Sequence, residues 1–575
     1  MHIERVPNRN SHPTILLREG WREGGRVRKR TLANLTHWPA HQLEAMRRVL
    51  KGETLVSLDE AFVVERSRAH GHVEAVLSVI RQLGLERMIN SRRCRERDLV
   101  IGMIVEQLIH PCSKLATTRM WHTTTLAEEL SIGDADEDAL YEALDWLLAR
   151  QKRIEKKLAA RHLQEGSLVL YDVSSSYYEG HTCPLVRHGH NRDRKRGKPI
   201  IVYGVMTDAA GRPVATEVYP GNTGDPTTVA DQVEKLRTRF GLSRVVLVGD
   251  RGMLTQTQIK HLKTYPGVGW ISALRSPAIR KLVESGVLQM SLFDHQNLAE
   301  TISPEYPGER LVACMNPLLK EERRRKREEL IGMTSVALEK IARSVARRTK
   351  TPLGKEEIGL RVGKRINAYK VGKHFKLRIE DGHFSWERDE ASIEREKMLD
   401  GIYVIRTSEP REQLSAEDVV RQYKSLSQVE RLFRTLKGID LRIRPIRHRT
   451  EAHVRAHIFL CVMAYYVEWH MRQALASLLF VDEELAADRK VRDAVAPAKP
   501  SASARRKKAK RVSRDELPVH SFETLLQELG TRCRNRCRMK SAPMGATLDQ
   551  TTERTALQTR AAELLAALPV DEHCV

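Results

Sequence analysis

The spacing of apolar residues separates a helical part of the chain from a strand-rich part. From about residue 70 to 165, apolar residues recur every three to four positions, as in DEDALYEALDWLLARQKRIEKKLAARH, which is typical of packed amphipathic helices. Strand-like runs begin at residue 167 with SLVLYDVSSSYY, and IIVYGVMTD and PVATEVYPGN follow. The helical TTVADQVEKLRTRFG, the apolar SRVVLVGDRGM, a second helix and GWISALR complete the order β-β-β-α-β-α-β. We therefore expect an α/β fold with a mixed sheet and helices on its faces.

Two hairpins are predicted outside this order. Residues 13–39 place Gly24-Gly25 between two half-apolar runs. Between about 276 and 400 the regularity breaks, and a very basic helix, KEERRRKREELI, precedes HFKLRIEDGHFSWERD, whose turn is Asp381-Gly382. We interpret this region as a β-containing insertion, after which GIYVIRTS returns to the sheet.

The rest of the chain is predicted to be mainly helical. SAEDVVRQYKSLSQVERLFRTLKG is expected to form one long helix with Ser415 as N-cap and Gly438 as its stop, and a buried helix follows. Residues 497–513 have the composition of a disordered basic linker, and Cys533 and Cys537 are expected on a helix surface. The predicted organisation is an N-terminal β-hairpin region (1–65), a helical region (66–165), a first part of the α/β core (166–275), an insertion (276–400), a second part of the core (401–480), and a basic linker with a C-terminal helical tail (481–575).

Charge and composition point to a polyanionic partner. The chain has 98 Lys and Arg against 74 Asp and Glu, a net charge of +24. DNA or RNA is the commonest partner of such a protein, although a basic protein without a nucleic-acid role is the alternative. The eight cysteines are scattered, which favours a reducing cytoplasm. No signal peptide is recognisable, and the longest apolar run, at 458–467, is too short to span a bilayer, so we expect a cytoplasmic protein with no membrane partner.

Three acidic residues stand out against this basic background. Asp172 lies in the first predicted strand, Asp250 at the carboxyl end of RVVLVG, and Glu430 inside the long helix. The fourth strand is expected to pair beside the first, which would bring Asp172 and Asp250 together. Two Mg²⁺ ions need oxygen ligands of this kind to clamp the oxygens of a phosphoryl transfer. Each carboxylate alone has a plainer explanation, because buried aspartates often cap turns.

The helix that carries Glu430 has a distinctive face. Tyr423, Glu430 and Lys437 are spaced by seven, and Arg434 lies four residues after Glu430, so all four fall on one stripe. A phenol, a carboxylate and two cations on one face fit a surface that holds both metal and phosphate. An ordinary surface helix with a Glu–Arg pair is the alternative.

These motifs resemble those of a known family. YKSLSQVERLFRTLK is similar to the Y-x2-R-x3-E-x6-K signature of the DDE transposases of bacterial insertion sequences (the IS-four-like superfamily), with Tyr423, Glu430 and Lys437 in place. The chain departs from the signature at Leu426, where the family has arginine, and Arg431 or Arg434 is our candidate for the missing cation. LYDVSSSYYEG resembles the family's first-aspartate strand, VVLVGDRGM its second, and the blocks occur in the expected order from about 90 to 475.

The resemblance implies a fold, a reaction and partners. It implies an RNase H-like catalytic core interrupted by the insertion, with Asp172, Asp250 and Glu430 as catalytic residues that hold Mg²⁺ or Mn²⁺, two ions in all. It implies cleavage of transposon-end DNA and strand transfer into target DNA by a homodimer. Alternatives from other classes are an RNase H-like nuclease without strand transfer and a catalytically inactive DNA-binding relative.

Other polar groups have two interpretations each. His181, Cys183, His188 and His190 crowd one loop but lack the repeated spacing of a zinc site. In the same loop Arg192, Arg194 and Lys195 are expected to touch DNA phosphate, as are Tyr423, Arg431, Arg434 and Lys437 on the helix. Trp386 in the insertion hairpin either stacks on a displaced base or packs within the hairpin. The helical region 66–165 is either a DNA-binding domain or an ordinary bundle.

Overall fold

The computed structural model describes residues 1–9, 11–53, 62–539 and 546–569. The chain forms two compact units. One combines Met1–Ala69 with Arg532–Glu553, and the other combines His70–Thr531 with Arg554–Val575.

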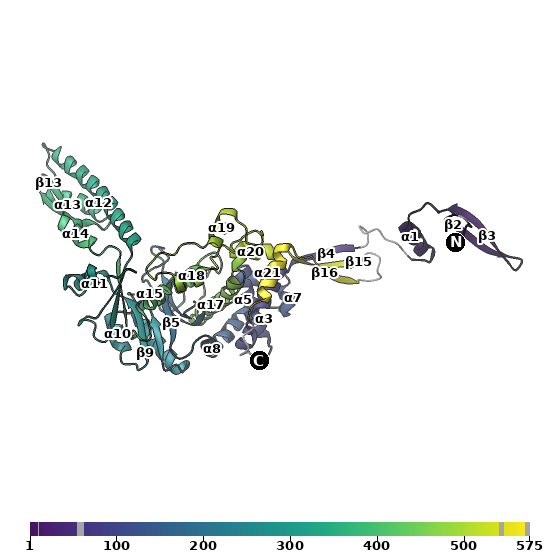
Figure 1. Cartoon of the computed structure of the whole chain (residues 1–575), viewed down its shortest axis with the longest axis horizontal. Coiled ribbons are helices and arrows are strands. Elements are labelled where there is room, and N and C mark those ends of the chain that lie inside the picture. Colours follow the sequence, from purple (N-terminus) through teal and green to yellow (C-terminus); the bar gives the residue numbers. More distant parts are fainter. Residues whose placement is uncertain (10, 54–61, 540–545, 570–575) are drawn as a thin grey trace. The chain divides into compact units, whose positions relative to one another are not determined.

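The first unit contains two small antiparallel sheets. One consists of β1 (His2–Val6), β2 (Thr14–Glu23) and β3 (Arg26–Asn34), followed by helix α1 (Ala40–Leu50). Gly24 and Gly25 form its β2–β3 turn with φ values of 55° and 77°, which glycine adopts without strain, so the predicted hairpin is confirmed. The second sheet has the order β16-β15-β4 and joins β4 (Phe62–Ala69) to β15 (Cys533–Met539) and β16 (Thr547–Thr551) (Figure 1).

The position of β15 corrects one prediction. Cys533 and Cys537 lie on this strand and not on a helix, and the Cys537 side chain is buried. The run CRNRCRM has arginine at every second position, which is the period of a strand, and the strand is completed by pairing with β4, far away in the sequence.

The second unit begins with a helical region. Its helices are α3 (Gly71–Gln82), α4 (Leu85–Ile89), α5 (Arg95–Ile109), α6 (Lys114–Met120), α7 (Leu126–Leu130) and α8 (Glu137–His162). Asp136 caps α8 by accepting the Ala139 N–H. The apolar faces of these helices share one core with the sheet that follows, so the helical region is packed on the sheet and has no separate core.

A mixed sheet forms the centre of the second unit. Within the described residues it has eight strands in the order β10-β11-β14-β9-β8-β5-β6-β7. They are β5 (Ser167–Tyr177), β6 (Ile200–Asp208), β7 (Pro213–Tyr219), β8 (Val245–Val248), β9 (Val268–Ala273), β10 (Leu298–Thr301), β11 (Arg310–Met315) and β14 (Ile402–Thr407). The short helical elements between them are η1 (Asp225–Thr228), α9 (Val229–Glu234), η2 (Lys235–Arg239), α10 (Gln256–Leu262), α11 (Ser276–Glu284) and η3 (Met290–Leu292).

The predicted strand order is confirmed. β5 pairs antiparallel with β6 and parallel with β8, and β8 pairs parallel with β9. β14 returns to the sheet and pairs antiparallel with β9, as expected for GIYVIRTS. The mixed α/β fold class follows directly from these pairings.

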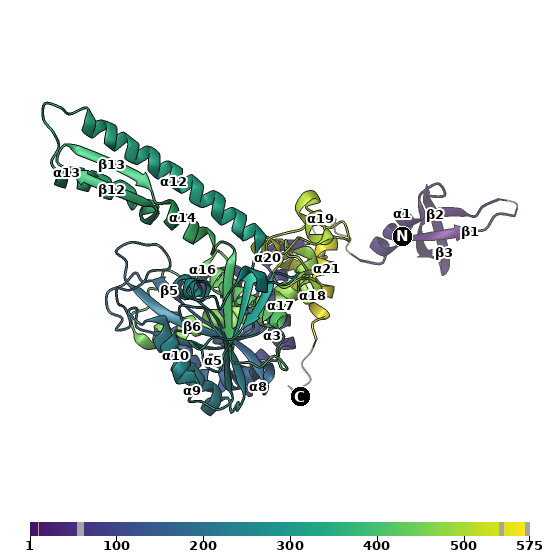
Figure 2. The same ribbon diagram turned by 60° about the vertical axis from the view of Figure 1, so that its left-hand side comes forward.

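The segment between β11 and β14 contains a small subdomain with its own apolar core. It consists of α12 (Pro317–Ala346), α13 (Lys355–Ile366), η4 (Gly372–His374), β12 (Phe375–Glu380), β13 (His383–Arg388) and α14 (Glu390–Lys397). Figure 2 shows the long helix α12 alongside the β12–β13 hairpin. Gly382 forms the predicted turn, and Trp386 packs edge-to-face against Phe375, with 5.8 Å between ring centroids.

Two helices replace the single helix predicted for 415–438. Ser415 caps α15 (Ala416–Lys424) as expected, and α16 (Leu426–Lys437) starts after Ser425 and ends at Gly438. α17 (Glu451–Ala474) follows and is buried along most of its length. The remaining elements are η5 (Ala476–Leu478), α18 (Leu485–Val491), α19 (Ala502–Lys510), α20 (Phe522–Gly530) and α21 (Ala556–Ala566).

The basic segment 497–513 is not a disordered linker. Ser501 caps α19 by accepting the Ala504 N–H, and the Lys507 side chain is buried. Lys507 Nζ donates to Ala476 O at 2.7 Å and lies 2.8 Å from Glu483 Oε2. The composition of this segment is typical of a linker, but the segment forms a capped helix that packs against its neighbours through the buried Lys507.

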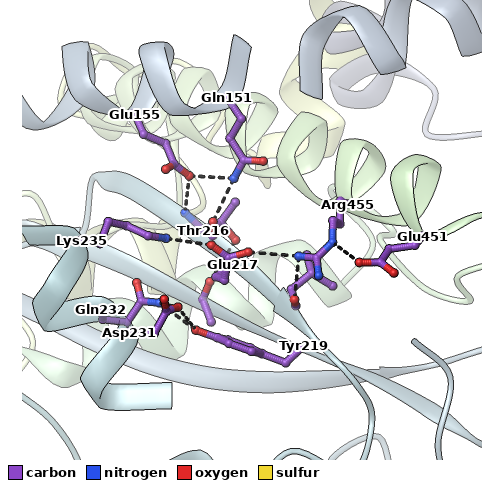
Figure 3. A network of polar contacts seen from close by, with 12 residues as sticks. Gln151, Glu155, Thr216, Glu217, Tyr219, Asp231, Gln232, Lys235, Glu451 and Arg455 are labelled. Carbon is purple, nitrogen blue, oxygen red and sulfur yellow. Dashed lines mark hydrogen bonds and ion pairs between the residues drawn. The ribbon is translucent and has the colours of Figure 1, made fainter. Parts of the chain in front are cut away.

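A polar network fastens the edge strand β7 to the helices around it (Figure 3). The buried Glu155 of α8 accepts the Thr216 N–H at 3.0 Å. Glu217 binds Lys235 at 3.1 Å on one side and Arg455 of α17 at 3.0 Å on the other. Such pairs also blunt an edge that is otherwise open to further strands.

No single helix in the described part of the chain is long and apolar enough to cross a membrane. By length and composition only, the bent pair Arg95–Ile109 and Lys114–Met120 passes the same test together.

Candidate active site

The register of the sheet brings Asp172 and Asp250 to one level. Leu170 of β5 lies opposite Val248 of β8 in a parallel pair, and each aspartate comes two residues later on its strand. The ladder continues past β8, because the Gly249 N–H donates to Ile271 O at 3.1 Å. Side chains alternate along strands, so both aspartates project from the same face as Leu170 and Val248.

Helix α16 covers that face. Tyr203 of β6 lies opposite Ser174, which is on the Asp172 side of β5, and its ring packs against Phe433 of α16 with 5.8 Å between centroids. The opposite face carries α9, since Tyr219, in line with Ser175, donates to Asp231 of that helix. The helix that contains Glu430 therefore packs on the aspartate face of the sheet.

Backbone groups orient both aspartates and leave one oxygen of each available. Asp172 Oδ1 accepts the Val173 N–H at 2.8 Å. Asp250 Oδ1 accepts the N–H groups of Gly252 and Met253 at 2.9 and 2.7 Å. Among the described residues, no hydrogen bond or ion pair involves Oδ2 of either residue or the carboxylate of Glu430, which is exposed.

The electrostatics of Asp172 reflect burial and neighbouring charge. The pKa of Asp172 is raised to about 7, mainly by burial and also by the charges of Asp250 and Asp225, while the Val173 N–H and Arg192 oppose the rise. Asp172 and Asp250 are thus close enough for their charges to repel. A cation beside them would relieve this repulsion and keep both ionised.

Tyr423 connects Asp250 with Glu430. Burial raises the pKa of Tyr423 to about 12, and the negative charges of Asp250 and Glu430 both add to the rise, whereas Arg251 lowers it. The phenol therefore lies within electrostatic reach of both carboxylates, although Tyr423 is on α15 and Glu430 on α16.

The three carboxylates do not form a compact group in this structure. Among the described residues there is no cluster of three or more His, Cys, Asp or Glu side chains that could hold a metal ion. The loop of His181, Cys183, His188 and His190 is among the described residues and contains no such cluster. The register of the sheet brings Asp172 and Asp250 together. Glu430 is related to them only in that the charges of Glu430 and Asp250 both act on the Tyr423 phenol.

Lys437 is not the exposed lysine that the helix stripe predicted. Its Nζ donates to Ser175 O at 2.6 Å and pairs with Asp193 at 3.1 Å, and its side chain is only 11% exposed. Burial lowers the pKa of Lys437, and Asp193 opposes that change. Lys437 thus fixes the end of α16 to β5. The seven-residue spacing in the sequence predicts which helix face Lys437 lies on, but it does not reveal that Ser175 and Asp193 contact Lys437 in the folded chain.

Asp193 was missed by the sequence analysis. Its side chain is 1% exposed, accepts the Tyr177 N–H at 2.9 Å and also pairs with Arg444. The only signal in the sequence is one acid inside the basic loop GHNRDRKRGKP, where a lone carboxylate is more readily taken for a solvated residue.

The other predicted DNA contacts differ in availability. Arg192 is held by Asp225, with Nη2 at 2.5 Å from Oδ2. Arg194 and Lys195 are exposed at the tip of the same loop, and Arg431 and Arg434 are exposed on α16 next to Glu430. For the side chains of Arg431 and Arg434, no hydrogen bond or ion pair is present within the described residues.

Comparison with known proteins decides the family. The model of the transposase DDE domain matches residues 165–467, more than half of the chain and all three candidate carboxylates. The chain belongs to the DDE transposases. The model of the N-terminal domain of IS1634 family transposases matches residues 3–59, which places the transposase among those of bacterial insertion sequences.

Two further comparisons add little. No curated protein matches the transposase significantly. The cryo-EM structure of the piggyBac transposase synaptic complex with hairpin DNA is similar at a TM-score of 0.34 and 10% identity, covering 80% of this chain and 77% of that one. The family match alone identifies the transposase as a DNA-processing enzyme that binds DNA.

Proposed function

We propose that the transposase cleaves DNA at insertion-sequence ends and joins those ends to target DNA. The observation that carries the proposal is the shared register of Asp172 and Asp250 on the sheet face covered by the Glu430 helix, inside the matched DDE domain. In this proposal β5, β6, β7, β8 and β9 form an RNase H-like core. Its antiparallel β5–β6–β7 meander with parallel β8 and β9 beside β5 supports this assignment.

The donor set suits a divalent cation. The free oxygens of Asp172 and Asp250 and the unpaired carboxylate of Glu430 are hard oxygen ligands, the kind that Mg²⁺ and Mn²⁺ prefer. Two such ions, when bound, would stabilise the charge that develops on the attacking and leaving oxygens of a phosphodiester. We propose Asp172, Asp250 and Glu430 as their ligands.

The remaining residues are proposed to hold and orient DNA. Arg431 and Arg434 present charge next to Glu430, and Arg194 and Lys195 present it from the loop beyond β5. Arg192 supports that loop through Asp225, and Tyr423 supplies a phenol hydroxyl beside Asp250. Lys437 is proposed to position α16 and not to contact a phosphate itself.

Joining distinguishes transposition from simple nuclease activity. The full-length enzyme is incubated with Mg²⁺, a linear DNA that carries the element's ends, and a supercoiled target plasmid. Cleaved ends covalently joined to the target are expected. Cleavage without joined product would favour the nuclease without strand transfer, and binding without cleavage would favour the inactive relative.

We also propose that the active assembly is a homodimer on paired ends and that the enzyme works in the cytoplasm. Light scattering of the enzyme with end DNA tests the first point. The expected mass is that of two chains and two DNA ends. A complex that contains a single chain would rule out the dimer.

A further inference from the structure

A pocket of about 280 Å³ lies beyond the end of β5 and is lined by positive charge. The residues that matter are Lys114, Arg442, Arg444, Arg447, His448 and His457. No aspartate or glutamate from the described part of the chain lines it. Its size is at the small end of ligand pockets, which fits a group such as phosphate better than a large molecule.

Lys114 is the unusual member of this lining. It is the first residue of α6, the residue is 5% exposed, and within the described part of the chain its ammonium group forms no hydrogen bond or ion pair. Burial lowers the pKa of Lys114, and only the thiols of Cys461 and Cys112 oppose that change. A buried cation without a partner costs free energy, so this arrangement calls for an anion from outside the chain.

The other lining groups are two imidazoles and three arginines; Arg444 is paired with Asp193 and Arg447 with Glu179, and Arg442 forms no ion pair within the described residues. The rings of His448 and His457 lie 4.7 Å apart between centroids, tilted by 48°. Burial lowers the pKa of both, and with the charge of Lys114 that of His457 falls to about 3. Both imidazoles are therefore neutral at physiological pH and add hydrogen-bonding capacity without further repulsion. Arg442 is exposed at the rim, and no described residue pairs with its guanidinium.

The pocket is rigidly linked to the proposed catalytic strand. Tyr178, just after β5, donates its hydroxyl to His448 O at 3.1 Å, and the Glu179 N–H donates to Ile446 O at 2.9 Å. Arg444 uses Nη1 on Asp193 and Nε on Lys437 O, so Nη2 is left for a ligand. Gln107 on α5 fixes the other wall by donating to Leu441 O at 2.6 Å.

We propose that this pocket binds a phosphate group of the DNA backbone, with Lys114 as the buried cation and Arg442 and Arg444 as guanidinium donors. Arginine forks and a lysine point charge are the groups that proteins use for phosphate. The site would hold the strand that passes the carboxyl end of β5, away from the cleaved bond. The inference rests on the proposed function for its choice of DNA as the source of the phosphate.

Lys114→Met tests the pocket without exposing a new polar group. Since it removes an unpaired buried charge, the variant should be as stable as the wild type or more stable. In the full-length wild type, sodium phosphate should raise Tm above its value in sodium chloride of equal ionic strength, as a ligand that binds only the folded state does. That increment should disappear in Lys114→Met and shrink in Arg442→Gln.

Lys260→Gln is the matched control. Lys260 is exposed on α10, which packs with α9 on the other face of the sheet, and the change removes the same charge. It should keep the full phosphate increment. An unchanged increment in Lys114→Met would overturn the phosphate site.

Binding of a mixed-sequence duplex without divalent metal tests the DNA assignment. Losing one phosphate contact lowers the slope of log K against log salt by about 0.9. This change is expected for Lys114→Met and not for Lys260→Gln. A phosphate increment that needs Lys114, together with an unchanged slope, would assign the pocket to free phosphate and overturn the DNA contact. Failure of the wild type to cleave element ends would instead contradict the proposed function, since neither of these readouts involves cleavage.

Discussion

One buried carboxylate, Asp193, holds together three parts of the chain that are distant in sequence. It accepts the N–H of Tyr177 at the end of β5 and pairs with Lys437 of α16 and with Arg444 beyond that helix. Its position decides where α16 ends, and α16 carries Glu430. At the scale of single residues, the placement of the proposed catalytic glutamate therefore depends on an aspartate that no motif identifies.

Lys437→Ala should destabilise the enzyme because Lys437 is mostly buried. The change leaves Asp193 with one cation fewer and Ser175 O without its donor, a loss of about 1–3 kcal/mol for charge-assisted bonds. Arg434→Ala, on the exposed side of the same helix, should leave the free energy of unfolding within about 0.5 kcal/mol of wild type. Urea unfolding of the two variants checks this, and equal stabilities would refute the Asp193 linkage.

The proposed catalytic side chains could be selected from the sequence, whereas their supports could not. Asp172 lies within β5, Asp250 two residues beyond β8 and Glu430 in a signature, so strand periodicity and the family resemblance were enough to propose them. Lys437 and Asp193 could not be placed, because their environment comes from a loop and a strand end that meet only in the folded chain. The structure does not explain why Leu426 stands where the family signature has arginine. Arg431 and Arg434 lie exposed on the same helix.

At the scale of elements, strand order was predictable and pairing between distant segments was not. The order from β5 to β9 follows from apolar periodicity and right-handed crossovers. The addition of β10 and β11 to the sheet, the break at Ser425 and the folded α19 were missed. In α19 the decisive contact joins Lys507 to Glu483, and basic composition alone suggests a solvated segment instead.

The stability of the second unit should depend on pH through Glu468. Glu468 is fully buried on α17, and burial raises its pKa to about 7, while Arg472 opposes the rise. Between about pH 4.5 and 7 the folded state then binds a proton that the unfolded state has lost, so this group's contribution to stability falls as pH rises. Below pH 4.5 both states are protonated and the contribution is level.

Glu468→Gln removes that proton linkage and keeps an acceptor for Arg472. Relative to wild type, the variant should gain stability as pH rises from about 4.5 to 7, by an amount on the order of 1–3 kcal/mol. Thermal unfolding over this range measures the difference. A difference that is independent of pH would show that Glu468 is not protonated in the folded state.

At the scale of the whole molecule, the end of the sequence contributes to the core of the second unit. α21 buries Leu557, Ala561 and Leu565 and packs against α3, and Arg554 pairs with Glu74 of that helix at 3.2 Å. β15, earlier in the same region, completes a sheet with β4 in the first unit. Both associations join the last part of the chain to its first part, so a sequence read locally gives no indication of them.

Leu557→Ala should therefore destabilise the second unit although it lies near the end of the chain. Truncation of a buried leucine costs about 2–5 kcal/mol. Thr559→Ala, on the exposed side of α21, is the matched control and should cost less than about 0.5 kcal/mol. Equal melting temperatures for the two variants would show that α21 is not part of the core.

Asp172, Asp250 and Glu430 are proposed to act together in metal-dependent cleavage. The direct measurement compares cleavage and binding of element-end DNA in Mg²⁺ by Asp172→Asn, Asp250→Asn, Glu430→Gln and the control Glu234→Gln, an exposed carboxylate on α9 across the sheet. Each of the first three should lose cleavage by at least about a hundredfold, because a metal ligand acts mainly on the transition state. Each should still bind DNA through its phosphate contacts, and Glu234→Gln should cleave normally. Near wild-type cleavage by any of the three would contradict the account.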